Sequence, residues 1–458
     1  MNNNNKHILI GVVLCLIAYL ASRYLWLQPD TISFTLTITV ITAYFWVTEA
    51  LPIPLTSVIP IGLFPFVGVL THQQAASSLG SHVIVLLMGA FMLAVGIEKS
   101  GVHRRIAFAI LKVIGGDSAL RIIFAIMATS SILSMWISNT ATVVALLPVV
   151  LAICASTDDN RFKIALLLGL AYSASLGGVG TLIGTPPNVI FASVYEEFAG
   201  EEYGFIRWMK VSVPIIVISI PLMALWLARG IRLSSAIHLP KCDGWSIAEK
   251  RVLVIFALVA LLWVFRKEPL GGWSQMLDIN TVGDSSVALL GVLAMAITSN
   301  GKGGRIIEWQ DAKEIPWGML LLFAGGICIA KAFVSSGLSE LLGQFFVALG
   351  TLPVLLSLFA LAIGVSFLTE ITSNTATATL MMPIIASAAI ALNLPIELLM
   401  IPVVISCSCA FCLPVATAPN SIVFASGEVS IKDMAKQGVA LNILVASIVA
   451  LVSFYFLT

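Results

Sequence analysis

Charged residues are scarce in this sequence. They make up 10% of its 458 residues, against 59% hydrophobic residues, and the formal net charge is +1. Soluble domains carry about 25% charged and about 45–50% apolar residues. A net charge this close to neutral gives no reason to expect a nucleic-acid partner. The mean hydropathy is +1.04 over the whole length, which predicts a membrane protein with many spans.

The patterns of enzymes and metal sites are also missing. The sequence shows no Ser/His/Asp set, no phosphate-binding glycine loop with a lysine and no cluster of metal ligands. The run "CSCAFC" (Cys407–Cys412) has no accompanying histidine or second cysteine pair, so it indicates buried small residues in a helix. We expect neither an enzyme nor an organic cofactor. The lack of a sizeable soluble domain argues equally against a receptor.

The hydrophobic residues form long continuous runs, such as His7–Ala21. Only helices and closed barrels satisfy the backbone in lipid, and a barrel would show alternating strands of about ten residues. The runs therefore favour an all-α polytopic membrane protein. The N-terminal run lacks a convincing cleavage site, so we interpret it as a first transmembrane helix. About eleven crossings are expected, at residues 8–28, 32–49, 52–70, 83–100, 164–196, 213–230, 249–265, 281–299, 316–336, 396–426 and 436–457.

Two further apolar stretches, residues 119–155 and 352–392, are too long for one crossing, which needs about 20 residues. Each carries Ser-Asn-Thr in its middle. Two full crossings would leave this pattern in an exposed loop, where nothing requires it twice. We therefore expect each stretch to be a re-entrant hairpin of two half-helices, with its tip near the membrane midplane.

The basic residues give the orientation. With both hairpins re-entrant and the N-terminus in the cytoplasm, most of the 24 lysines and arginines fall on the cytoplasmic side. This distribution follows the positive-inside rule. We therefore expect a multi-pass protein of the cytoplasmic (inner) membrane, in contact with the lipid bilayer, with a cytoplasmic N-terminus and an external C-terminus.

Three landmarks recur in order along the chain. Ser138 and Ser373, which begin the two Ser-Asn-Thr motifs, are 373 − 138 = 235 residues apart, and Asn188 and Asn420 of two matching proline loops are 420 − 188 = 232 apart. Residues 86–101 also resemble residues 321–337. Each copy holds an odd number of crossings, so the copies are expected to be inverted repeats, as in many secondary transporters. The predicted division is 1–31 (first helix, outside the repeat), 32–231 (repeat 1, with hairpin 119–155 and broken helix 164–196), 232–248 (cytoplasmic linker) and 249–458 (repeat 2, with hairpin 352–392 and broken helix 396–426).

The hairpin tips suggest an anion site. Ser138 and Ser373 precede apolar runs and are expected to be N-caps, with Thr140 and Thr375 in the first turn. A helix N-terminus presents free N–H groups and about half a positive charge. Two such ends facing each other would bind a molecule with negative charge at both ends. Neither motif contains Arg or Lys, so dipoles and any bound cation must supply the positive charge.

The same regions suggest cation sites. Asn139 and Asn374 tolerate left-handed turn geometry, and their amide oxygens are hard ligands. Ser134 and Thr369, five residues earlier, add hydroxyls, and the segments 178–188 and 412–420 expose carbonyls where proline and glycine interrupt a helix. An all-oxygen shell suits Na⁺, whereas softer metals want His or Cys. Two Na⁺ sites beside one anion would offset its charge.

Packing is the competing interpretation. Ser, Thr and other small residues also join transmembrane helices, and a single Ser-Asn-Thr would favour that reading. The duplication of the motif together with its proline loop favours function. Two acidic residues lie in or beside apolar runs, which is a functional indication in a membrane protein. A structural role is favoured for Glu49, and Glu370 stays open between structure and function.

The chain resembles the divalent anion/sodium symporters, the dicarboxylate carriers nicknamed INDY. The segment Cys407–Val423 is similar to the family's sodium:sulfate/dicarboxylate symporter signature, and the paired Ser-Asn-Thr motifs resemble its dicarboxylate branch. The resemblance covers almost the whole chain. The residues at the signature spacing are Ser408, Phe411, Pro414, Ala416, Asn420 and Val423.

The resemblance implies a site and a mechanism. One Na⁺ site maps onto Ser134, Ser138, Asn139 and Gly184, and the other onto Thr369, Thr372, Asn374 and Ala416. The substrate carboxylates map onto Ser138, Asn139, Thr140 and Thr185 on one side, and onto Ser373, Asn374, Thr375 and Thr417 on the other. Pro186–Pro187 corresponds to Ala418–Pro419, a departure that bears on the shape of the second loop.

The expected function is sodium-coupled symport of C4-dicarboxylates such as succinate, malate and fumarate. The resemblance further implies a homodimer that moves its substrate domain as an elevator, and at least two Na⁺ ions. Sulfate or citrate transport, or sodium-independent dicarboxylate exchange on the same fold, stays an alternative.

Overall fold

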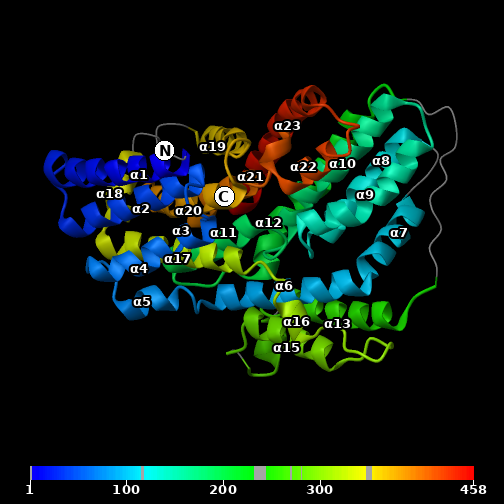
Figure 1. Cartoon of the computed structure of the whole chain (residues 1–458), viewed down its shortest axis with the longest axis horizontal. Helices are drawn as coiled ribbons and strands as arrows, with labels where there is room; N and C mark the ends of the chain where they lie inside the picture. The colour runs from blue at the N-terminus through cyan, green and yellow to red at the C-terminus, as the bar shows by residue number, and fades with distance from the viewer. Residues whose placement is uncertain (1–2, 115–117, 232–243, 269–270, 280, 347–352) are drawn as a thin grey trace.

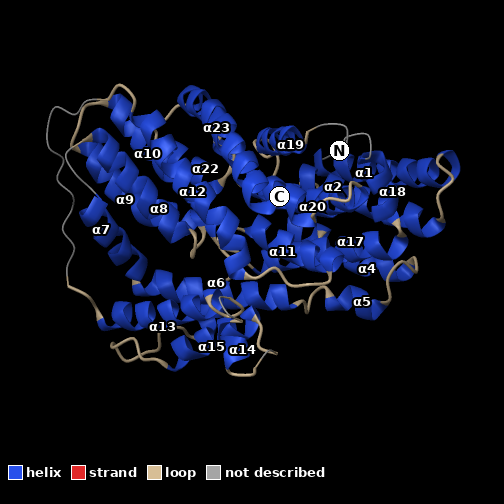
Figure 2. Cartoon of the chain, turned by 180° about the vertical axis from the view of Figure 1, so that it is seen from behind, coloured by secondary structure: helices blue, strands red, loops and turns tan. Residues whose placement is uncertain are grey.

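A computed structural model describes residues 3–114, 118–231, 244–268, 271–279, 281–346 and 353–458. Within these ranges the regular structure is helical, apart from an isolated β-bridge between Ser299 and Arg305 (Figure 2). Eight described helices are long and apolar enough to cross a membrane, and six apolar helices of 10–17 residues accompany them. The expectation of an all-helical, multi-pass membrane protein is confirmed.

The helices follow one another as Figure 1 labels them. The first part contains α1 (Asn3–Leu20), α2 (Asp30–Thr48), α3 (Ile53–Thr56), α4 (Val58–Phe66), α5 (His72–Ser77), α6 (His82–Ser100) and α7 (Val102–Ile114). Next come α8 (Ala119–Ser134), α9 (Asn139–Ala155), α10 (Asn160–Gly177), α11 (Pro186–Ala199) and α12 (Phe205–Ala228).

The second part of the chain also alternates between long and short helices. It contains α13 (Ile247–Val264), α14 (Gly272–Met276), α15 (Asp284–Ile297), α16 (Trp309–Ala312), α17 (Trp317–Ser336) and α18 (Leu338–Phe346). It ends with α19 (Val354–Leu368), α20 (Asn374–Ala391), α21 (Ile396–Ser406), α22 (Ala418–Phe424) and α23 (Ile431–Leu457).

Several expected spans differ from the helices. The stretch 52–70 is divided between α3 and α4, and the stretch 281–299 holds a helix of only 14 residues, α15. Helices α7 and α18 were not among the expected spans, because each is too short and too amphipathic for a crossing. The number eleven therefore stays a prediction. Most of the predicted linker, residues 232–243, lies outside the described residues, as does residue 352 at the start of the second hairpin stretch.

The helices that carry the two motifs pack into one another. Helix α10 is buried from Ala165 to its end at Gly177 and contacts α8, α9, α12 and also α22. Helix α11 contacts α20 and α21, and α12 contacts α23. In Figure 1, α22 and α23 lie close to α10, although they are far apart from it in the sequence. The two halves of the chain thus share one interior.

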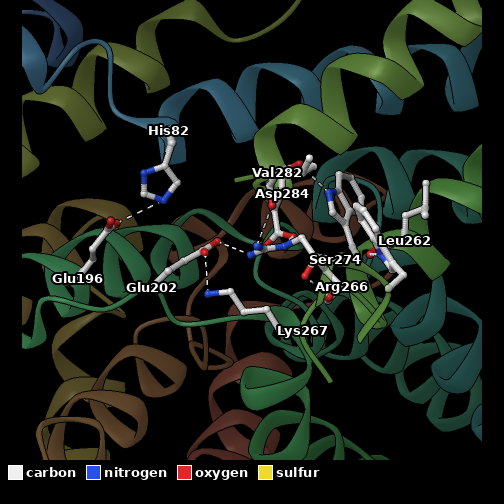
Figure 3. A network of polar contacts seen from close by, with 11 residues as sticks. His82, Glu196, Glu202, Leu262, Arg266, Lys267, Ser274, Val282 and Asp284 are labelled. Carbon is white, nitrogen blue, oxygen red and sulfur yellow. Dashed lines mark hydrogen bonds and ion pairs between the residues drawn. The ribbon is translucent and has the colours of Figure 1, made fainter. Parts of the chain in front are cut away.

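A network of ion pairs joins the connection between α11 and α12 to the ends of α13 and α15 (Figure 3). The guanidinium of Arg266, only 4% exposed, pairs with Glu202 at 2.6 Å and with Asp284. Lys267 also pairs with Glu202, at 2.8 Å. Burial alone would raise the pKa of Glu202, but the hydrogen bonds from Arg266 and Lys267 lower it to about 2. The network therefore fixes this connection against the neighbouring helices.

Candidate substrate and cation site

One cavity of about 670 Å³ receives both Ser-Asn-Thr motifs. Eleven of the thirteen residues predicted for substrate or Na⁺ line it: Ser138, Asn139, Thr140, Gly184, Thr185, Thr372, Ser373, Asn374, Thr375, Ala416 and Thr417. The other two, Ser134 and Thr369, are buried, and their hydroxyls donate hydrogen bonds to Asn139 and Asn374 of the motifs. The cavity thus gathers side chains that lie more than 200 residues apart in the sequence.

The first motif lies where α8 ends and α9 begins. Ser138 is the N-cap of α9, and its Oγ accepts a hydrogen bond of 3.2 Å from the Ala141 N–H. Ser134, the last residue of α8, donates from Oγ to Asn139 Oδ1 at 2.6 Å. The cap and this bond together fix the direction of the Asn139 amide at the edge of the cavity.

The chain between α10 and α11 lines the cavity beside this hairpin tip. Asn188 is fully buried, and its Nδ2 donates to the carbonyl oxygens of Gly178 at 3.0 Å and Thr181 at 2.7 Å. The turn then passes so close to the hairpin tip that only glycine fits at position 184. A Cβ there would lie 2.4 Å from Gly178 O, 2.9 Å from Met135 O and 3.0 Å from Ser134 O. Backbone oxygens therefore converge around Gly184.

The second motif has the same framework. Thr369 Oγ1 donates to Asn374 Oδ1 at 2.6 Å and to Cys407 O at 3.1 Å. In the chain between α21 and α22, Asn420 Nδ2 donates to Ala410 O and Leu413 O, each at 3.0 Å. The Thr369–Asn374 bond and the two bonds of Asn420 span 5, 10 and 7 residues, as their counterparts in the first half do. Repetition in the sequence therefore corresponds to repetition of hydrogen bonds.

Three details depart from the sequence predictions. Ser373 is the N-cap residue of α20, as expected, but its side chain makes no capping hydrogen bond. The hydroxyl of Thr372 instead bonds within the tip, to Leu368 O at 2.9 Å and to Thr377 Oγ1 at 2.7 Å. Asn139 and Asn374 are the first helical residues of α9 and α20 rather than left-handed turn residues.

The donor set fits Na⁺. The atoms that converge on each side of the cavity are amide, hydroxyl and backbone oxygens, which are hard ligands. The amide oxygens of Asn188 and Asn420 are buried and make no hydrogen bond to any described residue. In the described part of the chain, no group of three or more His, Cys, Asp or Glu side chains could hold a metal ion. The site therefore suits an alkali cation rather than a transition metal.

The cavity wall is acidic. Its described lining includes four glutamates, Glu49, Glu98, Glu314 and Glu370, and contains no Lys, Arg or His. Sequence reasoning had considered Glu49 and Glu370 but missed Glu98 and Glu314. Glu98 lies one residue before Lys99 at the end of an apolar run, a position usual for a solvated helix end, so its sequence gave no signal of a role in the site.

The positive contributions come from the backbone. The N-termini of α9, α20 and α11 begin at Asn139, Asn374 and Pro186, all of which line the cavity. Free N–H groups and the helix dipole make such ends favourable for anions. The cavity therefore combines positive helix ends with a negatively charged wall, and fits an anion only together with cations.

Comparison with known proteins gives the wider context. The family described as citrate transporter matches residues 43–398. The sodium-dependent dicarboxylate transporter SdcS of Staphylococcus saprophyticus is 35% identical over 477 aligned residues, covering 98% of this chain and 91% of that protein. The protein of the same name from Staphylococcus aureus is 36% identical with the same coverage, 98% and 91%.

The fold has a solved counterpart in the YdaH transporter of Alcanivorax borkumensis. The two chains superimpose with a TM-score of 0.59 at 12% identity, covering 82% of this chain and 86% of the other. The membrane-spanning helices, the family match and the SdcS relatives together define a multi-pass membrane transport protein rather than an enzyme. The chain belongs to the divalent anion/sodium symporter family.

Proposed function

We propose that this protein is a secondary active transporter that couples Na⁺ to the symport of C4-dicarboxylates such as succinate, malate and fumarate. One observation carries the proposal: both Ser-Asn-Thr motifs open into a single cavity whose described lining has no basic side chain. The relatives named sodium-dependent dicarboxylate transporter support the same substrate and ion.

Electrostatics explain the coupling. A dicarboxylate brings two negative charges to a wall that already carries four glutamates. In a protein interior of effective dielectric constant about 20, two like charges about 4 Å apart repel by about 4 kcal/mol. Helix ends offset part of this repulsion, and Na⁺ ions offset the rest. Anion binding therefore depends on the cation, which is the thermodynamic basis of symport.

The residues take the following roles in the proposal. The carboxylates are bound by Ser138, Asn139, Thr140 and Thr185 at one end and by Ser373, Asn374, Thr375 and Thr417 at the other. At least two Na⁺ ions are bound, one by Ser134, Ser138, Asn139 and Gly184 and one by Thr369, Thr372, Asn374 and Ala416. The matched hydrogen bonds of Asn139 and Asn374 support this symmetric assignment.

The larger architecture also belongs to the proposal. Residues 32–231 and 249–458 are inverted repeats, and the α8/α9 and α19/α20 pairs are re-entrant hairpins. The repeated hydrogen bonds of Asn188 and Asn420 support the repeat. The protein is a homodimer in the cytoplasmic membrane with its N-terminus in the cytoplasm and its C-terminus outside, and it carries substrate by an elevator movement.

Citrate transport is the second candidate, because the matching family is described as citrate transporter. Sulfate transport and sodium-independent dicarboxylate exchange on the same fold are further alternatives. The cavity of about 670 Å³ has room for a tricarboxylate. Its two matched ends, however, favour an anion with two carboxylates.

Uptake by proteoliposomes tests the proposal. Purified protein is reconstituted, and uptake of labelled succinate is measured with an inward Na⁺ gradient and with choline in place of Na⁺. Unlabelled succinate, malate, fumarate, citrate and sulfate are added as competitors. We expect uptake that requires Na⁺ and is inhibited best by C4-dicarboxylates. Equal uptake in choline would support exchange instead, and stronger inhibition by citrate or sulfate would support the corresponding alternative substrate.

A further inference from the structure

Glu370 makes an unusual set of contacts at the tip of the second motif. Its side chain is 4% exposed. Oε1 accepts hydrogen bonds from Phe411 N at 2.7 Å, Cys412 N at 2.8 Å and Asn442 Nδ2 at 2.8 Å, and Oε2 accepts one from Leu413 N at 3.0 Å. One carboxylate thereby joins the α19–α20 tip, the chain between α21 and α22, and helix α23.

All four partners of this carboxylate are donors. An ionised carboxylate only accepts hydrogen bonds, so the contacts match its charged form. Yet in the described part of the chain no Lys, Arg or His forms an ion pair with Glu370. A buried charge of this kind is unfavourable unless it is paired or coordinated. Three backbone dipoles and one amide compensate it in part, and a cation beside it would complete the compensation.

The oxygens that would bind such a cation lie next to Glu370. Thr369 precedes it and bonds Asn374 Oδ1 at 2.6 Å. The N–H of Leu413 donates to Glu370, and Leu413 lies three residues before Ala416, which lines the cavity. Glu370 therefore fixes the distance between the two segments that supply the proposed ligands, and it adds a negative charge close to them.

The first half lacks this carboxylate. The 235-residue offset between the motifs places Met135 at the position of Glu370. There the tip accepts through its backbone instead of a side chain, because the hydroxyl of Thr181 donates to the Met135 carbonyl oxygen. The asparagine bonds are the same in both halves. The two halves thus share these asparagine bonds but differ at this one position, where the second half has a carboxylate and the first half has Met135.

We propose that Glu370 is the positioning residue of the second cation site and that its charge makes this site bind Na⁺ more tightly than the site of the first half. The inference rests on the proposed function, since it names the Na⁺ sites of that cavity. It adds that the two sites are unequal and that a single residue causes the difference.

Three variants of the full-length protein separate charge from structure. Glu370→Gln removes the charge, Glu370→Asp keeps the charge but shortens the side chain, and Asn442→Ala removes one hydrogen bond while the charge stays. Purified protein in choline chloride is titrated with NaCl, and its thermal unfolding temperature is recorded. The KM for succinate at saturating Na⁺ is measured in proteoliposomes as a separate quantity.

We expect Glu370→Gln to raise the NaCl concentration for half-maximal stabilisation by about tenfold or more, as removal of a charge near a cation predicts. Glu370→Asp should restore part of this affinity, and Asn442→Ala should change it by less than about twofold, since a neutral hydrogen bond contributes only about 1 kcal/mol. The KM for succinate at saturating Na⁺ should not rise, because Glu370→Gln removes a negative charge from the cavity wall. Where Glu370→Gln does not fold, Glu370→Asp alone must show a raised Na⁺ requirement.

Two results would overturn the inference. One is wild-type Na⁺ affinity in Glu370→Gln, or in Glu370→Asp where only that variant folds. The other is an equal loss of affinity in Asn442→Ala and Glu370→Gln, which would show a purely structural contact. Failure of the proposed function would appear in the uptake assay, as succinate uptake by the wild type that does not depend on Na⁺. The Na⁺ titration of the purified protein is independent of that assay.

Discussion

Asn139 and Asn374 occupy matching positions on one cavity. Each amide oxygen accepts a hydrogen bond of 2.6 Å from a hydroxyl five residues earlier, that of Ser134 or of Thr369. Each residue also begins the helix that follows its motif. The amides are therefore oriented before any ligand arrives, and this preorganisation lowers the entropy lost on binding.

Replacing either asparagine should abolish Na⁺-coupled uptake. Asn139→Ala and Asn374→Ala each remove an oxygen that cation and anion share in the proposal. We expect initial rates to fall by about 100-fold or more, because even the loss of a group that only orients a metal ligand costs about 10–100-fold. Uptake of labelled succinate by proteoliposomes under a Na⁺ gradient measures this. Asn160→Ala, at an exposed position at the start of α10, is the control. Wild-type flux in either cavity variant would refute the shared role.

Thr375→Val should weaken dicarboxylate binding without altering the fold. The substitution keeps the volume but deletes the hydroxyl of a residue that lines the cavity. The loss of one hydrogen bond predicts about a three- to tenfold lower affinity, measurable by calorimetry with succinate at saturating Na⁺. Thr379→Val is the matched control, because Thr379 lies one turn further along α20 and its hydroxyl bonds the Thr375 carbonyl oxygen at 2.8 Å. Equal affinities for wild type and Thr375→Val would exclude that contact.

The sequence predicted the helices of this protein better than the positions at which they begin and end. Runs of apolar residues predicted the long helices, because an apolar run is a local pattern. The repeated Ser-Asn-Thr motif predicted that residues 138–140 and 373–375 belong to one site, because its two copies are nearly identical. The limits of α3, α4 and α15 were not predictable, since a run of apolar residues does not show where a short helix ends.

The missed parts of the site depend on distant contacts. Glu370 bonds residues 41 to 43 positions further along the chain and Asn442, 72 positions away. No local pattern specifies such partners, so its role stayed open. Sequence spacing placed Ser373 at the N-cap but did not reveal that its side chain makes no capping bond, nor that Thr372 forms hydrogen bonds inside the tip. The duplicated motifs predicted the residues that both halves contribute to the site. The differences between the two halves were visible only in the structure.

The ion pairs around Arg266 predict a pH dependence of stability. The folded protein holds the pKa of Glu202 at about 2, below its ordinary value of 4.5. A lowered pKa means stabilisation that is fully present above about pH 4.5 and is lost as the pH falls toward 2, amounting to at most about 3 kcal/mol. Glu202→Gln should therefore lower the unfolding temperature at neutral pH, and the difference from wild type should shrink in acid.

Thermal unfolding in detergent at about pH 7, 5 and 4 checks this expectation. Glu201→Gln is the neighbouring control, because the Glu201 side chain is 58% exposed and its pair with Arg207 is open to solvent, whereas the Glu202 side chain is 25% exposed. Exposed ion pairs contribute about 0–1 kcal/mol, so this control should differ little from wild type. A Glu202→Gln difference that is the same at every pH would contradict the ion-pair explanation.

Gly184→Ala tests whether backbone oxygens form the first cation site. The added Cβ would lie 2.4 Å from Gly178 O and 2.9 Å from Met135 O, so the loop must move away from the hairpin tip. Overpacking of this kind costs about 1–3 kcal/mol, and we expect the Na⁺ requirement for uptake to rise by about tenfold. Gly364→Ala in α19, where an added Cβ meets no atom within 4 Å, should transport normally. An unchanged Na⁺ dependence in Gly184→Ala would show that the cation is bound without this close approach of the two segments.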